Sequence, residues 1–276
     1  MPMTTNIVSW NIQAATGVDG VTSSKRIADD IRDFADADVI CLQEVMRTGE
    51  NDQVHDIASF FPHHEAFFGT AINRAHPSGR LEFGNMILTR LPVLQAAYHK
   101  LPEPAEPESL SMPRQATELI LQYNNETLRL VTLHLDYFAV KQRAAQVRYL
   151  ANLYIEGIQR FRQPSPDVGT EQFKSIPETH LSIFTGDFNF KVDSADYKQL
   201  ISTTEEPGLS DCWRLHHGKK PHDPTCGIFD HVQWKEGPHC RDFFFASPDI
   251  AKRVTDMAVQ TQTAASDHQP IRLTVD

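Results

Sequence analysis

The stretch Leu181-Ser182-Ile183-Phe184-Thr185-Gly186-Asp187-Phe188-Asn189 decides the fold. Its β-branched and aromatic residues predict a buried strand that ends at Gly186, where the backbone can turn or approach a ligand closely. Side chains two residues apart on an extended chain point the same way, so Asp187 and Asn189 can reach one metal ion or one phosphate. An Asp/Asn turn after a strand is also common, and this stretch alone favours that structural interpretation.

Three other apolar runs carry polar groups at their ends. Asn11 closes an apolar strand that begins at Ile7, and Glu44 closes a second buried strand. Near the far end of the chain, Asp267 and His268 stand just before the apolar run that begins at Ile271. Carboxylates and amides suit a hard, oxygen-liganded cation, and histidine suits proton transfer. Four such strand ends favour one shared site over four unrelated turns.

Taken together, these pieces resemble the endonuclease/exonuclease/phosphatase superfamily, the deoxyribonuclease-I-like phosphoesterases. Each piece is weak alone, but seven occur in the family's order from Ile7 to Ile271: Ser-Trp-Asn11, Leu-Gln-Glu44, Gly84-Asn85, Thr-Leu-His134, Gly-Asp187-Phe-Asn189, Arg241-Asp242-Phe-Phe and Ser-Asp267-His268.

The fold class follows from the same pattern. Strand-rich halves with helices alternating between strands predict a layered α/β sandwich. The resemblance implies a four-layer α/β sandwich, with two mixed β-sheets packed face to face and helices on the outer faces. We expect residues 1–276 to form a single domain of this kind.

Apolar periodicity predicts the remaining elements. Helices are expected from about residue 23, around 54–61, over 140–154, from 194, and over 209–215. Further strands are expected at 67–68, 85–88, 115–123, 127–134, 229–234, 241–246, 254–263 and 271–275.

Three loops are expected to set the choice of substrate. The polar segment 70–84 carries Arg74, His76, Arg80 and Glu82 and is expected to overhang the site, with Glu82 as a partner for a histidine. The proline-rich segment 102–113 is interpreted as a surface loop and not as a domain boundary, because matched site residues stand on both sides of it. The segment 163–179 is expected to be a mobile loop.

The bulk composition is that of a soluble α/β protein. The 276 residues are 40% hydrophobic with a mean hydropathy of −0.39, and no apolar run approaches the roughly 20 residues that span a bilayer. The first six residues lack a positive region, so we expect no signal peptide and a cytoplasmic location. The four cysteines are expected to be reduced thiols; three have histidine neighbours, but their spacing matches no common zinc pattern.

Charge bears on the substrate. The formal net charge is −10, the pI is near 5.7, and the longest basic run is Lys219-Lys220. Affinity for a polyanion comes largely from Lys and Arg that neutralise phosphates. The balance therefore favours a small or lipid-linked phosphate ester, with nucleic acid as the alternative.

The resemblance implies a metal site and a proton-transfer site. Glu44 is the main candidate metal ligand, its structural alternative being a salt bridge or helix cap, and Asn11 helps to hold the metal or the phosphate. His268 is the expected general base, and Asp242 is expected to orient its ring as an acid orients the histidine of a triad. Asp267 is expected to bind metal or to support His268.

The remaining site residues are expected to handle water and phosphate. In similar proteins the residues at Asp187 and Asn189 position the attacking water and bind phosphate, and Asp187 is also a candidate ligand for a second metal. His134 ends a strand where similar enzymes place a phosphate-binding or leaving-group-protonating residue. Asn85 and Arg114 are further candidate phosphate ligands. Arg143 and Gln146 stand near family-like positions and, like Asn85, have structural alternatives.

Three hypotheses follow. The first is a hydrolase of small or lipid-linked phosphate esters that uses one or two Mg²⁺ or Mn²⁺ ions, because the candidate ligands are oxygen donors. The second is an endonuclease or exonuclease with the same site, which requires a basic groove. The third is a catalytically inactive binding module, which is disfavoured because the whole ligand set is present.

Overall fold

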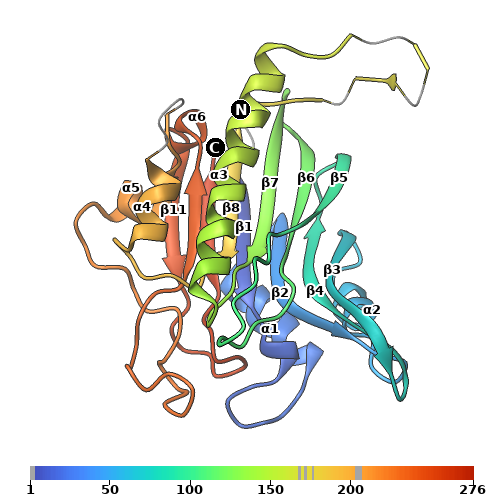
Figure 1. The fold of residues 1–276 in the computed structure, drawn as a ribbon, viewed down its shortest axis with the longest axis vertical. Coiled ribbons are helices and arrows are strands. Elements are labelled where there is room, and N and C mark those ends of the chain that lie inside the picture. The colour runs from blue at the N-terminus through green and yellow to red at the C-terminus, as the bar shows by residue number, and fades with distance from the viewer. Residues whose placement is uncertain (1–3, 167–168, 171–172, 176, 203–206) are drawn as a thin grey trace.

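The computed structural model describes residues 4–166, 169–170, 173–175, 177–202 and 207–276. Within these residues the strands form two six-stranded sheets, with helices against them (Figure 1). The first sheet has the spatial order β11 (Val254–Val259), β12 (Ile271–Val275), β1 (Thr5–Asn11), β2 (Val39–Arg47), β4 (Gly79–Thr89) and β3 (Glu65–His76). The second has the order β5 (Val93–Lys100), β6 (Gln115–Tyr123), β7 (Glu126–His134), β8 (Ser182–Asp187), β10 (Asp242–Ala246) and β9 (Ser210–Asp211).

The centre of the first sheet brings two of the polar strand ends together. β1 and β2 run parallel, and Asn11 pairs with Gln43, one residue before Glu44. β12 runs antiparallel to β1 and starts at Ile271, opposite Ser9. The segment just before β12 therefore lies at the edge where β1 and β2 end.

The second sheet aligns three polar side chains in one row. β7 and β8 are parallel and pair His134 with Asp187. β10 is antiparallel to β8 and pairs Asp242 with the same Asp187. Because register sets which side chains are neighbours across strands, the ends of β7 and β8 and the start of β10 form one polar edge.

Alternation along the strands builds three apolar layers. Ile7 and Ile183 belong to the core between the two sheets, whereas Val8 packs with residues of the helices outside the first sheet. Phe184 likewise faces the helices outside the second sheet. Successive strand residues point to opposite faces, so the central strands of both sheets are buried on both sides. The predicted four-layer α/β sandwich is confirmed.

The helices have local start signals. α1 (Ser24–Phe34) is capped by Ser23, whose hydroxyl accepts the N–H of Arg26, and with α2 (Gln53–Ser59) it covers the first sheet. The long α3 (Val140–Arg162) and α4 (Ala195–Ile201) cover the second sheet. A 3₁₀ turn, η1 (Gln13–Ala15), follows β1, and α5 (Cys212–His217) and α6 (Pro248–Ala251) complete the described helices.

Several sequence-based boundaries were wrong. The segment 70–84 is not a polar loop but the outer part of the β3–β4 hairpin, and it turns only around Pro77 and Ser78. Residues 229–234 form turns and not a strand. β11 ends at Val259 and not at residue 263, the helix expected over 209–215 is α5 preceded by β9, and the strand β5 was not predicted.

The other two loops have different outcomes. The segment 102–113 contains no helix or strand, as predicted. Part of the segment 163–179 (167–168, 171–172 and 176) lies outside the described residues, so its expected mobility stays a prediction. None of the described helices is long and apolar enough to cross a membrane. All four cysteines are buried and carry free thiols.

Candidate active site

A cavity of about 720 Å³ opens where the strand ends of the two sheets meet. Its floor is polar and is lined by Glu44, Arg114, His134, Asp187, Asn189 and His268. These residues come from β2, the segment before β6, β7, β8 and the segment before β12. The structure thus brings together six of the residues singled out from the sequence.

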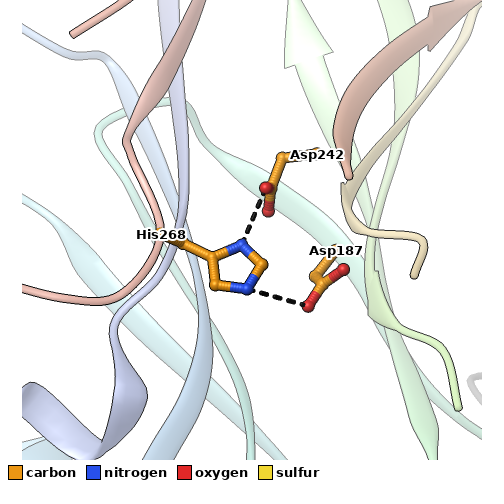
Figure 2. A group of neighbouring side chains, drawn as sticks. All are labelled: Asp187, Asp242 and His268. Carbon is orange, nitrogen blue, oxygen red and sulfur yellow. Dashed lines mark hydrogen bonds and ion pairs between the residues drawn. The ribbon is translucent and has the colours of Figure 1, made fainter. Parts of the chain in front are cut away.

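A histidine between two carboxylates lies at the bottom of this floor (Figure 2). Nδ1 of His268 is hydrogen-bonded to Oδ2 of Asp242 at 2.8 Å, and Nε2 lies 3.6 Å from Oδ2 of Asp187. All three side chains are almost completely buried. The His268 backbone is anchored too, because the Trp10 indole donates to its carbonyl at 2.9 Å. Asp242 therefore stands behind the ring, and Asp187 stands on its cavity side.

The protonation of this group is set by burial and by its neighbours. Burial alone would lower the pKa of His268, but the charges of Asp242, Asp187 and Asp267 outweigh it and raise the pKa well above the usual value. Burial raises the pKa of Asp187, and the charge of Asp242 raises it further while His268 opposes the change. One proton is therefore held tightly among the imidazole and its carboxylates.

Glu44 sits next to this cluster on a strained backbone. Its φ is +60°, at the point where the β2–β4 register shifts between Leu42 and Val45. Such a conformation is uncommon outside glycine, and it turns the carboxylate into the cavity. Burial raises the pKa of Glu44, and the charge of Asp267 raises it further. A buried carboxylate next to a second carboxylate is an environment in which a cation is stabilising.

The donor set fits a hard divalent cation on the Glu44 side. The oxygens of Glu44 and Asp267 are hard donors of the kind that Mg²⁺ and Mn²⁺ prefer. The indole N–H of Trp234 donates to Oδ2 of Asp267 at 3.1 Å, which orients that carboxylate. Asp187, Asp242 and His268 also offer ligand atoms within 4.8 Å of one another, but there the imidazole already bonds to Asp242.

Asn11 holds carboxylates through its amide hydrogens. Its Nδ2 donates to Oε1 of Glu44 at 3.0 Å and to Oδ2 of Asp187 at 3.1 Å. Its Oδ1 accepts the backbone N–H of Gln13 at 3.1 Å. In this arrangement Asn11 bridges the two sheets as a donor, and its role as a metal ligand stays a prediction.

His134 faces the same two carboxylates. Its Nε2 lies 3.3 Å from Oδ2 of Asp187, and its Nδ1 lies 3.8 Å from Oε1 of Glu44. Burial, followed by the positive charges of Arg114 and His268, holds the pKa of His134 well below its usual range. The His134 ring is therefore neutral near pH 7 and can donate one hydrogen bond.

The candidate phosphate ligands divide into two groups. Asn189, with φ of +51°, donates through Nδ2 to the carbonyl of Leu135 at 3.0 Å, and it lines the cavity floor. Arg114 also lines the floor; its Nε lies 3.5 Å from Oδ2 of Asp136, and its Nε and Nη1 make no hydrogen bond among the described residues. Asn85 is not among the described residues that line the cavity, and its amide donates to Gln115 at 2.7 and 3.1 Å.

Three further residues have structural contacts. Arg143 donates to Asp196 and to two loop carbonyls, and Gln146 accepts the N–H of Asp136. Glu82 pairs with Arg47 at 2.7 Å and accepts from Asn73, so the expected histidine partner was wrong.

The sequence reasoning missed the aromatic support of the site. Trp234 is 2% exposed, and its ring centroid lies 5.3 Å from that of His268. Tyr137 packs edge-on against Trp234 at 5.5 Å, and the Arg241 guanidinium lies over both rings. Trp234 was assigned to a strand that does not form. The only sequence signal that could have assigned Trp234 to the site was its position between two of the family-like motifs.

Comparisons with known proteins place the chain by its fold and its family. No curated protein matches the chain. Among solved structures, an endonuclease/exonuclease/phosphatase from Beutenbergia cavernae is 21% identical, with a TM-score of 0.68, over 99% of this chain and 71% of that one. A mannosyl-6-phosphatase from Bacteroides thetaiotaomicron is 19% identical, with a TM-score of 0.71, over 99% and 100%. A humanized D. rerio TDP2 is 19% identical, with a TM-score of 0.66, over 99% of both chains.

The TM-scores of these matches establish a shared fold. The sequence model of the Endonuclease/Exonuclease/phosphatase family matches residues 8–268, which is nearly the whole chain and includes every residue of the polar floor. The chain belongs to the endonuclease/exonuclease/phosphatase family.

Proposed function

We propose that this chain is a metal-dependent hydrolase of phosphate esters, with His268 as the general base and Asp242 as the residue that orients it. The observation that carries the proposal is the buried His268–Asp242 hydrogen bond of 2.8 Å at the floor of a cavity that also holds Glu44. A histidine whose far nitrogen is fixed by a carboxylate is the arrangement used for proton transfer.

His268 receives the proton of the attacking water. Its Nδ1 is committed to Asp242, so Nε2 is the nitrogen on the cavity side. Water attacks phosphorus as its proton passes to Nε2, and the bond from phosphorus to the alcohol oxygen breaks. The proton passes on from Nε2 through solvent to the departing alkoxide, so that ester and water yield phosphate and alcohol. Asp187, 3.6 Å from Nε2, positions the water.

A cation fits beside Glu44 and Asp267, with Asp187 as a further oxygen donor. When bound, a divalent ion there would neutralise the phosphoryl oxygens and reduce the negative potential that raises the pKa of His268. Asn11 keeps the Glu44 and Asp187 carboxylates in place through its two N–H bonds.

Phosphate oxygens are bound by the donors across the floor. The Nε of Arg114 lies 3.5 Å from Oδ2 of Asp136, but its buried Nε and Nη1 groups make no hydrogen bond among the described residues, and leaving such groups without one is costly. The neutral ring of His134 and the Nδ2 of Asn189 both lie 3.3 Å from Oδ2 of Asp187. We therefore assign these three residues to the phosphoryl group.

The substrate is proposed to be a small or lipid-linked ester. The net charge of −10 disfavours a polyanion, and a phosphatase is among the structural neighbours. We further propose that residues 1–276 act as one domain, since the family match runs through both sheets.

A panel of substrates tests the proposal. Purified protein with Mg²⁺ or Mn²⁺ is assayed on sugar phosphates, inositol phosphates, phospholipids, nucleotides, DNA and RNA. Hydrolysis of a small or lipid ester that EDTA abolishes and His268→Ala impairs supports the proposal. Activity confined to DNA or RNA would support the nuclease, and specific binding without any turnover would support the inactive module.

A further inference from the structure

The wall of the active-site cavity is apolar where its floor is polar. Met112, Tyr137, Phe138 and Val232 line this wall. They come from three segments far apart in the chain: the loop 102–113, the β7–α3 connection and the turn region 227–240. Single exposed apolar residues are ordinary on protein surfaces. These four residues, in contrast, come from three loops and line one cavity, so they form one feature of the site.

Two of these side chains are exposed, and the backbone that carries one of them is held. Phe138 is 57% exposed and Val232 is 85% exposed. Asp230 accepts the backbone N–H groups of Val232 and Gln233 at 2.8 and 3.0 Å, which fixes the turn that presents Val232. Covering exposed apolar side chains is favourable, so a ligand that buries them gains affinity.

The rings of this wall favour a flat group. Phe138 packs edge-on against Tyr137 with centroids 4.7 Å apart and an angle of 90°. Because Phe138 is also more than half exposed, part of its side chain is available to an offset or edge-on aromatic partner. The polar Gln233 and Asp230 interrupt the apolar surface, so it covers one ring better than a long acyl chain.

The charges on the wall select a neutral group. Among the described residues that line the cavity outside its floor, the charged side chains are Asp230 and Lys235, and their charges cancel. The floor holds Arg114, which serves the phosphoryl group. The wall is thus matched to an uncharged part of the substrate.

We propose that Met112, Tyr137, Phe138 and Val232 form a subsite for a neutral ring on the alcohol side of the ester. This subsite rests on the proposed function, because the polar floor binds the phosphoryl group and the wall receives the alcohol. The substrate class is then a ring-bearing phosphate ester and not a phosphate with a purely polar alcohol.

Binding tests the subsite without turnover. Phenylpropylphosphonate and propylphosphonate, which lack a hydrolysable ester oxygen, are titrated in the presence of Mg²⁺ by calorimetry. The phenyl compound should bind at least about 10-fold more tightly. Phe138→Ala should reduce that ratio at least about 5-fold and Val232→Ala should reduce it less. Phe173→Ala, an exposed phenylalanine outside this cavity, is the matched control and should keep it.

Turnover gives the second readout. Phenethyl and ethyl phosphates, as monoesters and as methyl diesters, have primary alkoxide leaving groups of similar acidity. The ratio of their kcat/KM values should follow the binding ratio in all variants. A binding ratio near one, or a ratio that Phe138→Ala leaves intact, overturns the subsite even when both esters are hydrolysed. Ring-selective binding with no hydrolysis of any phosphate ester supports the subsite and overturns the proposed activity instead.

Discussion

His268 is held by Asp242 through Nδ1, which leaves Nε2 facing the cavity, and this arrangement makes it sensitive to substitution. Removing a positioned general base typically lowers the rate about 10²–10⁴-fold. We expect His268→Ala to lower kcat by this order with KM nearly unchanged, because Arg114 and Asn189 still bind the phosphoryl group. Steady-state kinetics on a substrate whose chemical step limits turnover checks this. Wild-type kcat in His268→Ala would exclude His268 as the base.

Glu44 and Asp242 separate metal binding from proton transfer. Glu44→Gln removes a charged oxygen donor and should weaken Mg²⁺ or Mn²⁺ binding at least about 10-fold, with little loss of fold. Asp242→Asn should lower kcat and leave metal affinity intact, since Asp242 stands behind the imidazole. Metal titration by calorimetry distinguishes the two variants.

Two outcomes would contradict this assignment. If Asp242→Asn lost the metal instead, the cation would belong to the Asp187–Asp242–His268 group. Undiminished activity in excess EDTA would exclude a hard cation altogether.

At the scale of elements, β5, β6 and β7 are tied by a buried carboxylate. Glu118 accepts from Arg129 Nε at 3.1 Å and lies 2.9 Å from His99 Nε2, whose other nitrogen contacts Tyr149 of α3. Burial raises the pKa of Glu118, but His99 and Arg129 outweigh it and the net pKa is lowered. The ionised carboxylate therefore stabilises the fold above the unfolded pKa, and this contribution is lost as pH falls through the lower folded value.

Glu118→Gln tests this pH dependence. At pH 7 we expect it to destabilise the protein by about 1–3 kcal/mol, because charged partners lose their carboxylate. Below about pH 4.5 the difference from the wild type should shrink, since the wild-type carboxylate itself becomes protonated. Urea denaturation between pH 7 and 3 measures it. Glu65→Gln, an exposed glutamate at the start of β3, is the control. A pH-independent difference would contradict the assignment.

Helices and strands that bury at least one face were predicted well, and exposed elements were not. The strands around Ile183 and Leu130 are nearly continuous apolar runs, as buried central strands are. The outer β3–β4 hairpin is exposed, and pairs such as Arg80 with Asn73 support it, so no apolar alternation marks it. Residues 229–234 contain Phe229, Val232 and Trp234, which favour a strand, but the side chain of Asp230 bonds the backbone into a turn.

At the scale of the whole molecule, charge predicts weak binding to nucleic acid. Few of the cations cluster, and the net charge is −10. We expect the Kd for generic duplex DNA to lie at or above the roughly 10⁻⁴–10⁻⁶ M of non-specific binders at physiological salt. Fluorescence anisotropy with labelled duplex measures it. Sub-micromolar binding that falls steeply with salt would move the assignment to a nuclease.

The sequence by itself named candidate residues of the site, because each stands next to an apolar run and the apolar pattern is a local property. Glu44, Asp187 and His268 could be named in this way. Tertiary structure alone decided their geometry. The pairing of Asp242 with Asp187 depends on β10 lying antiparallel beside β8, and the apolar wall depends on Phe138 and Val232 meeting across one cavity. Such contacts join distant segments, and strand order and register, not local pattern, determine them.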